Sequence, residues 1–217
     1  HDRALDALGR AIAENALLPE VQLAHGELLL LKGDVDGALR SFEAAANLLR
    51  TDPQLEARRG QALLAKGRSS EALPRLRAAV AGGFEAPDVQ RALALALAIE
   101  GLHAESERVI DAVEQDAAGD HELVVGFLAL ERQDFAGAER TLKSLAESRP
   151  GVAAMVNLLA AAVYPQVRYA DAVRLLERAH ELAPQAGVVA DNLAKARAAL
   201  AAEDLAAAGE VTRALPQ

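Results

Sequence analysis

A regular interval of 34 residues between positions of the same character constrains this chain more than any other feature. Prolines and glycines mark the interval in two series: Pro19, Pro53 and Pro87, then Gly33, Gly67 and Gly101. A unit of this length cannot bury a core alone, so neighbouring units must stack and cover one another. The spacing therefore predicts an array of repeated units rather than an ordinary globular domain.

The most regular unit, residues 53–86, predicts two amphipathic helices. Pro53 suits the first turn of a helix, where its missing N–H would have no partner. Gly67 ends that helix, because glycine adopts the left-handed conformation without a Cβ penalty. Small and large apolar residues alternate along both segments, as helix packing requires: Gly60, Ala72 and Ala79, and Leu55, Leu63, Leu73, Leu76 and Val80.

The second helix of this unit is expected to begin after Gly67. Ser69 or Ser70 can cap it, since serine side chains accept hydrogen bonds from the free amides at a helix start. Pro74 would break a helix interior, so we expect a start near Glu71 that places Pro74 in the first turn.

The same interval continues in the second half of the chain after a contraction of two residues near Gly119. Six positions recur 34 residues later: Gly126, Phe135, Ala138, Leu142, Leu145 and Pro150 are followed by Ala160, Tyr169, Ala172, Leu176, Ala179 and Pro184. This pattern resembles the tetratricopeptide repeat family, whose unit is a helix-turn-helix of the same length with small residues at fixed positions.

The resemblance implies an all-α fold, a right-handed solenoid of antiparallel helix pairs that forms a single array over residues 1–217. Its parts would be a partial unit with a second helix only, five full units and a degenerate cap: 1–18, then 19–52, 53–86, 87–118, 119–152 and 153–186, then 187–217. First helices are expected at 20–32, 54–66, 88–100, 120–132 and 152–163. Pro165 should end the last of these early.

Composition supports a helical chain and excludes several kinds of partner. Aromatic residues make up 3%, cysteine is absent, and the net charge is −9. The absence of cysteine excludes disulfides and thiolate chemistry. An acidic chain is a poor match for nucleic acid or an anionic membrane, and its apolar runs are too short to insert directly into a bilayer. A protein or peptide partner fits better.

No motif predicts catalysis, a metal or a cofactor. Asp34 and Asp36 have the spacing of the first calcium-loop ligands, but the later ligand and glycine positions hold Ala38 and Leu39. We therefore interpret this segment as a polar turn. The five histidines are scattered, and no nucleophile or phosphate-loop motif occurs. We expect no catalytic, metal-binding or cofactor-binding residues, and an enzyme ranks third among the functions.

The resemblance also implies that first helices line a concave groove that binds a partner. The positions carried over to this sequence give eight candidate residues: Arg58, Gln61, Arg91, Leu95, Phe127, Leu130, Asn157 and Tyr164. Two interpretations remain open. The apolar members either pack first helices against each other, or accept an amphipathic helix or extended peptide that places an acidic group near the arginines.

The function predicted from the sequence is a non-catalytic scaffold or adaptor, within a bacterial multiprotein assembly for secretion, pilus formation or polysaccharide export. The alternative is a regulatory or chaperone-like domain of a larger polypeptide. The periplasm or cell envelope is favoured over the cytoplasm. A homo-oligomer formed through the N-terminal partial unit is also allowed, because Leu5, Leu8 and Ile12 lack a covering helix on one side.

Overall fold

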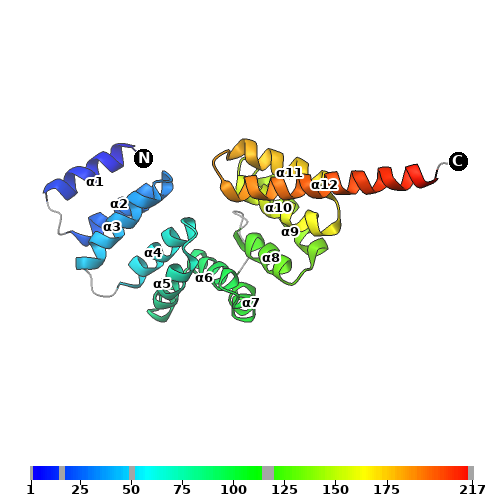
Figure 1. Ribbon diagram of the computed structural model, residues 1–217. Helices are drawn as coiled ribbons and strands as arrows, with labels where there is room; N and C mark the ends of the chain where they lie inside the picture. The colour runs from blue at the N-terminus through cyan, green and yellow to red at the C-terminus, as the bar shows by residue number, and fades with distance from the viewer. Residues whose placement is uncertain (1, 15–17, 49–51, 114–119, 215–217) are drawn as a thin grey trace. The chain divides into compact units, whose positions relative to one another are not determined.

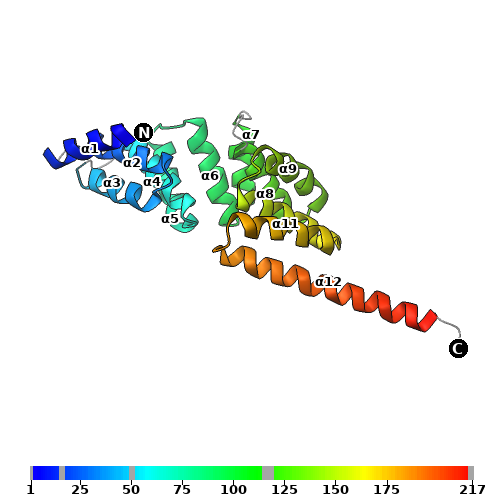
Figure 2. The ribbon, with the colours of Figure 1, turned by 90° about the horizontal axis from the view of Figure 1, so that it is seen from above.

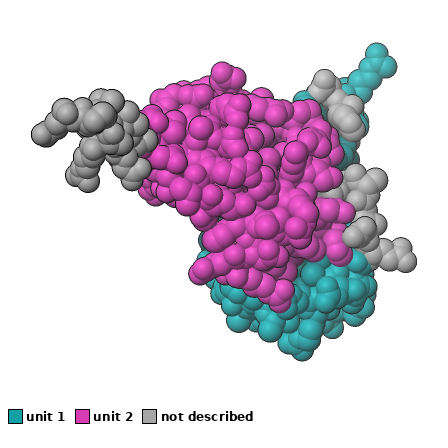
Figure 3. Space-filling model, turned by 90° about the vertical axis from the view of Figure 1, so that its right-hand side faces the viewer, with its two compact units in different colours: residues 1–114 teal, residues 115–217 magenta. Residues whose placement is uncertain are grey.

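The computed structural model describes residues 2–14, 18–48, 52–113 and 120–214, and every regular element in these ranges is a helix. The chain divides into two compact units, residues 1–114 and 115–217, which Figure 3 colours teal and magenta. Among the described residues, no helix is long and apolar enough to cross a membrane. The all-α repeat fold expected from the sequence is thus confirmed within each unit.

Unit 1 consists of α1 followed by three helix pairs, α2 with α3, α4 with α5, and α6 with α7 (Figures 1 and 2). Each pair is an antiparallel hairpin closed by a short turn. The bounds of its helices are α1 Asp2–Glu14, α2 Pro19–Leu31, α3 Val35–Leu48, α4 Pro53–Ala65, α5 Ser69–Ala81, α6 Pro87–Ile99 and α7 His103–Asp111.

Unit 2 consists of two helix pairs, α8 with α9 and α10 with α11, and the long helix α12 (Figure 1). A short 3₁₀ helix, η1, lies between α10 and α11. The bounds are α8 Asp120–Glu131, α9 Phe135–Ser148, α10 Ala153–Val163, η1 Tyr164–Gln166, α11 Tyr169–Leu182 and α12 Gly187–Ala214. All five first helices begin and end within one residue of their expected positions. The division of 1–217 into one continuous array stays a prediction.

Prolines start the first helices of unit 1, as the sequence predicts. Pro19, Pro53 and Pro87 are the first residues of α2, α4 and α6. Asp52 adds a side-chain cap to α4, because its Oδ1 accepts a hydrogen bond of 2.8 Å from the Leu55 amide. The helix starts are therefore determined locally, before any packing between helices.

The start of α5 differs from the expectation. This helix begins at Ser69, so Pro74 lies inside it rather than in its first turn. Neither serine caps it, because Arg68 occupies the N-cap position, where its side chain makes no capping bond. The Ser69 hydroxyl donates to Glu100. Pro74 removes one helical hydrogen bond, but it and Ser70 lie on the exposed face, where water can satisfy the carbonyl left without a partner.

Close contacts between first and second helices explain the recurring small residues. In the first helix, Gly26 and Gly60 lie against Phe42 and Leu76 of the second, and Gly126 lies against Leu142. A Cβ added at these glycines would come within 2.4 to 2.7 Å of those side chains. The hairpins can therefore pack at this distance only when the first-helix position has no side chain.

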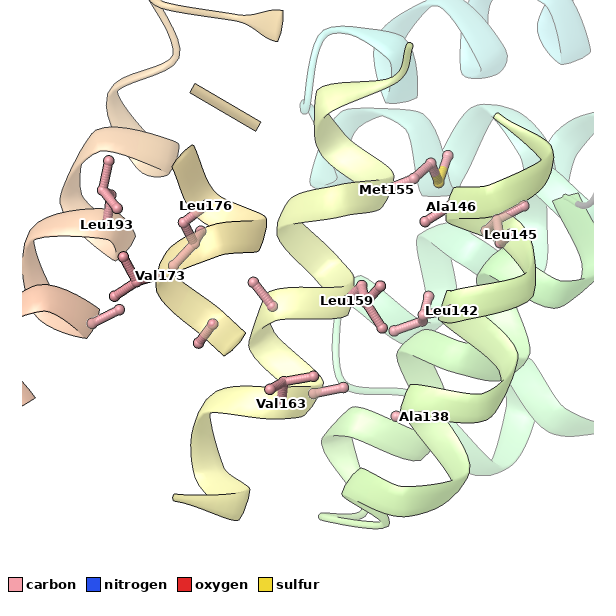
Figure 4. Packing of buried hydrophobic residues seen from close by; sticks show 14 residues of the cluster. Ala138, Leu142, Leu145, Ala146, Met155, Leu159, Val163, Val173, Leu176 and Leu193 are labelled. Atoms are coloured by element: carbon pink, nitrogen blue, oxygen red, sulfur yellow. The ribbon is translucent and has the colours of Figure 1, made fainter. Parts of the chain in front are cut away.

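The buried cores are built between neighbouring helices within each unit. Figure 4 shows the main cluster of unit 2, where Leu142 and Leu145 of α9 meet Met155, Leu159 and Val163 of α10. Val173 and Leu176 of α11 and Leu193 of α12 extend this cluster. Two clusters of unit 1 join α3 to α4 and α4 through α5 to α6 in the same way.

Both ends of the chain have a single helix beside the nearest hairpin. Helix α1 packs against α2, and Leu5, Leu8 and Ile12 are all half-buried there. At the other end, Val189, Leu193 and Ala196 of α12 are buried against the preceding hairpin. The contraction near Gly119 and the side chain of Glu210 lie outside the described residues.

Candidate functional site on the first helices

The first helices of unit 1 are joined by a polar network centred on Arg58 of α4. Its Nε donates to Glu27 Oε1 of α2 at 2.8 Å, and its Nη1 donates to Asp88 Oδ2 of α6 at 2.9 Å. Gln61, one turn further along α4, accepts from Arg58 Nη1 at 2.9 Å and donates to Asp88 Oδ2 at 3.0 Å. We call these four residues the Arg58 network. It links three successive first helices.

Burial and hydrogen bonding act in opposite directions on the charges of this network. Burial alone would raise the pKa of Asp88, but hydrogen bonds from Gln61 and Arg58 outweigh it and hold that pKa below its ordinary value. Burial would lower the pKa of Arg58, and its bonds to Glu27 and Asp88 reverse the direction and raise that pKa. Both shifts favour the charged forms of Asp88 and Arg58. The network contains two acidic residues and one basic residue, a formal excess of one negative charge.

A hollow of about 410 Å³ lies beside this network. It is lined by Glu27, Leu30, Leu31, Arg58 and Gln61. Leu31 is 70% exposed although it is a large apolar residue at the end of α2. The hollow thus combines an accessible apolar wall with polar groups that are already held in place.

The predicted site residues of unit 1 fall into two pairs. Arg58 and Gln61 come together in the network and line the hollow. Arg91 and Leu95 lie one turn apart on α6, and both are half-buried. Asp88, which is not among the predicted site residues, completes the network from the first turn of the same helix.

The predicted site residues of unit 2 begin with Phe127 and Leu130, which are half-buried on α8. Leu130 packs against the main core cluster of this unit, so it contributes to hairpin packing. The four apolar candidate residues thus divide between unit 1, which holds Leu95, and unit 2, which holds Phe127, Leu130 and Tyr164.

The remaining predicted residues of unit 2 lie around a smaller hollow of about 250 Å³. Tyr164 and Asn192 line it, together with Ala160, Ala161, Leu176 and Lys195. Asn192 Nδ2 donates to Asn157 Oδ1 at 3.0 Å, which connects α12 to α10. The ring of Tyr164 meets that of Tyr169 at a centroid distance of 5.3 Å. The two lining residues Asn192 and Tyr164 are thus each in contact with a residue outside the lining, Asn157 and Tyr169.

A third hollow, of about 520 Å³, lies between the second helices α9 and α11. Several of its charged residues are paired within the unit. Arg168 bonds to Glu139 at 2.7 Å and to Asp171 at 2.8 Å, and Arg174 bonds to the same Asp171. The Arg168–Glu139 pair joins α9 to the start of α11. The lining holds four basic and three acidic residues, so its net charge is opposite in sign to that of the Arg58 network.

The acidic turn at Asp34 has a structural role. Asp34 Oδ1 accepts from the Gly37 amide at 2.9 Å at the start of α3, and Asp36 pairs with Lys66. Across the part of the chain that the structure describes, no three residues of His, Cys, Asp or Glu gather as metal ligands would. The segment forms a turn between α2 and α3, and the interpretation that it binds no metal stays a prediction.

A family model described as tetratricopeptide repeat matches residues 1–56, 58–121 and 127–187, which is most of the chain. The comparison with curated proteins gave no match.

A residue that departs from the repeat pattern can be accommodated by a bond to the neighbouring helix. Ser106, for example, stands where the pattern has alanine, and its buried hydroxyl donates to the Ala94 carbonyl at 2.7 Å.

Solved structures with similar folds are distant in sequence. A tetratricopeptide repeat protein from Parabacteroides merdae matches with a TM-score of 0.63 and 14% identity, over 89% of this chain and 91% of its own. The human IFIT1 dimer with m7Gppp-AAAA matches with a TM-score of 0.73 and 18% identity, over 89% of this chain and 50% of its own. Yeast Tom70 matches with a TM-score of 0.60 and 16% identity, over 92% of this chain and 43% of its own. These matches show the fold alone, and the chain spans about half or less of the last two proteins.

Proposed function

Because this chain belongs to the tetratricopeptide repeat family, we propose that it is a non-catalytic scaffold that binds a segment of a protein partner along its first helices. Repeat arrays of this kind present an extended surface to a partner, and their stacked helices supply rigid positions for recognition. The net charge of −9 favours a protein or peptide over nucleic acid as that partner.

The observation that supports this proposal is the hollow of unit 1. Leu31 exposes most of its side chain there, beside polar groups that neighbouring helices already hold in place. An apolar anchor next to fixed polar groups is the arrangement by which helical grooves accept amphipathic segments. Such a site loses little entropy when it binds, because its polar side chains are ordered beforehand.

The eight predicted groove residues remain the proposed contacts. Arg58 and Gln61 line the hollow of unit 1, Tyr164 lines the hollow of unit 2, and Asn157 accepts a hydrogen bond from Asn192 of that lining. Arg91, Leu95 and Phe127 are half-buried and offer part of their side chains. Leu130 has the weakest support, because it packs into the core of unit 2. A setting in a bacterial multiprotein assembly stays a prediction.

A capture experiment tests the proposal. Immobilised wild-type chain and a Leu31→Gln variant are exposed to extract of the source cells, and retained proteins are quantified by mass spectrometry. Burying a leucine contributes about 1.5–3 kcal/mol, so proteins bound through this hollow should fall roughly tenfold or more on the variant. Circular dichroism checks that the variant keeps its helical content.

The matched control is Leu205→Gln, because Leu205 is a similarly exposed leucine in unit 2, at 74%. It removes the same apolar area from the surface without touching the hollow. Proteins lost from the Leu31 variant but kept by the Leu205 variant support the proposal. Equal retention on all three chains would contradict it.

A further inference from the structure

The Arg58 network determines which charge a partner can bring to the hollow of unit 1. Arg58 is the only basic residue among those that line it, and Glu27 and Asp88 both hold its guanidinium. The side chain is 24% exposed and uses its Nε and Nη1 in these bonds. The bonds leave Nη2 for an acidic group of a partner, but that group would lie beside two carboxylates that repel it. This differs from the acidic partner group expected near the arginines.

The two carboxylates have capacity left for a cation. The bonds to Arg58 and Gln61 use one oxygen of each, Oε1 of Glu27 and Oδ2 of Asp88. A carboxylate accepts through both oxygens, with about four lone-pair sites in all. The two carboxylates face a single guanidinium, so the network has an excess negative charge. The network therefore attracts a second cation and repels an anion.

The charge of unit 1 as a whole also favours a cation at this hollow. Residues 1–114 contain 18 Asp or Glu and 13 Lys or Arg, so unit 1 as a whole is acidic. Leu30 and Leu31 add apolar surface to the same hollow. A side chain that fits here needs a positive charge for the carboxylates and an apolar neighbour for the leucines.

We propose that the hollow of unit 1 binds a basic amphipathic segment of the partner, whose lysine or arginine bonds to carboxylate oxygens of Glu27 and Asp88 that Arg58 does not use and whose apolar side chain packs on Leu30 and Leu31. This inference rests on the proposed function and specifies its partner. Arg58 is a positioning residue: it keeps the two carboxylates at fixed places on α2 and α6. Preorganised opposite charge of this kind determines specificity and association rate more than total affinity.

Designed peptides test the inference on the full chain. One peptide carries leucine on one helical face and lysine on the other, a second replaces every lysine by glutamate, and a third replaces every leucine by serine. Binding is measured by fluorescence polarisation at low and high salt. We expect the leucine–lysine peptide to bind, the glutamate peptide not to bind, and the serine peptide to bind at least about tenfold more weakly, because it loses the apolar contact.

Paired variants separate this site from general attraction to an acidic protein. Glu27→Gln with Asp88→Asn removes two charges and retains side-chain oxygens that can still accept from Arg58. Glu43→Gln with Glu85→Gln removes the same charge from exposed positions of unit 1 outside the hollow. The first pair should weaken the leucine–lysine peptide about tenfold, and the second less than about twofold.

Several outcomes would overturn the inference. Equal weakening by both variant pairs means that only net charge matters. If the chain prefers the glutamate peptide, or binds neither the leucine–lysine peptide nor the glutamate peptide, the hollow does not bind a basic segment. If proteins captured from extract depend on Leu31 but not on Glu27 and Asp88, the scaffold function stands and the basic character of its partner is wrong.

Discussion

Gly60 shows how a single side-chain position determines the distance between two helices. A Cβ at this place would lie 2.6 Å from Leu76 Cγ and 3.3 Å from the Ala72 carbonyl oxygen. Leu76 is fully buried, so it has no open space into which it could turn. The recurring small residue is therefore explained by the close approach of the second helix.

We predict that Gly60→Ala lowers the free energy of unfolding by about 1–2 kcal/mol. Alanine favours a helix over glycine by up to about 1 kcal/mol, but overpacking a core costs about 1–3 kcal/mol and outweighs that gain. Gly9→Ala is the matched control, because nothing lies within 4 Å of its added Cβ in α1. It should raise the free energy of unfolding by about 0.5–1 kcal/mol. Thermal melts followed by circular dichroism measure both, and a stabilised Gly60→Ala would contradict the packing argument.

At the scale of elements, the turns between paired helices share one backbone feature. Each places a residue with positive φ after the first helix: Gly33, Gly67, Gly101, Gln133 and Val167. The first three have φ values from 72° to 81°, and the last two are not glycine yet have φ of 60°. A side chain in this region costs about 1–2 kcal/mol, so unit 2 holds strain that the turns of unit 1 avoid.

We predict that Val167→Gly stabilises the chain. Valine is β-branched, so positive φ is less favourable for Val167 than for Gln133. The Val167 side chain is 59% exposed, so its removal loses little buried area. Relief of about 1–2 kcal/mol of strain exceeds the 0.5–1 kcal/mol by which glycine favours the unfolded chain. The expected net gain is up to about 1 kcal/mol, measured as a higher melting temperature.

Val188→Gly provides the comparison, because Val188 is also exposed but lies in α12 with a helical backbone. Glycine there only weakens the helix, so the melting temperature should fall. A fall for both variants would mean that the backbone at Val167 is not strained.

The sequence predicts elements here better than it predicts side-chain partners. Glycine at 67 and proline at 53 act through local backbone chemistry, so helix bounds follow from the residues themselves. Asp88 was missed because its role depends on Arg58, 30 residues earlier on another helix. Its neighbour Pro87 marked the helix start, but no local rule indicates which helix the carboxylate faces. The prediction that Ser69 or Ser70 caps α5 was wrong because Arg68 holds the N-cap position, so both serines already lie within the helix.

At the scale of the whole molecule, the buried clusters follow the two units. Among the described residues, one set of clusters draws on helices α2 to α7 and another on α8 to α12. Stability in repeat proteins is approximately a sum of unit terms and nearest-neighbour terms. Where the nearest-neighbour term is small, cooperativity breaks down and parts of an array unfold separately.

We therefore predict two unfolding transitions in differential scanning calorimetry, one for each unit. Gly60→Ala should lower only the transition of unit 1. Gly126→Ala should lower only that of unit 2, because its Cβ would lie 2.7 Å from Leu142 Cδ2 in the buried core there. The two substitutions are chemically identical and occupy the same position in their repeats, so each controls for the other. A single transition that both variants shift equally would show that the units fold as one cooperative array over residues 1–217, as the repeat spacing alone predicts.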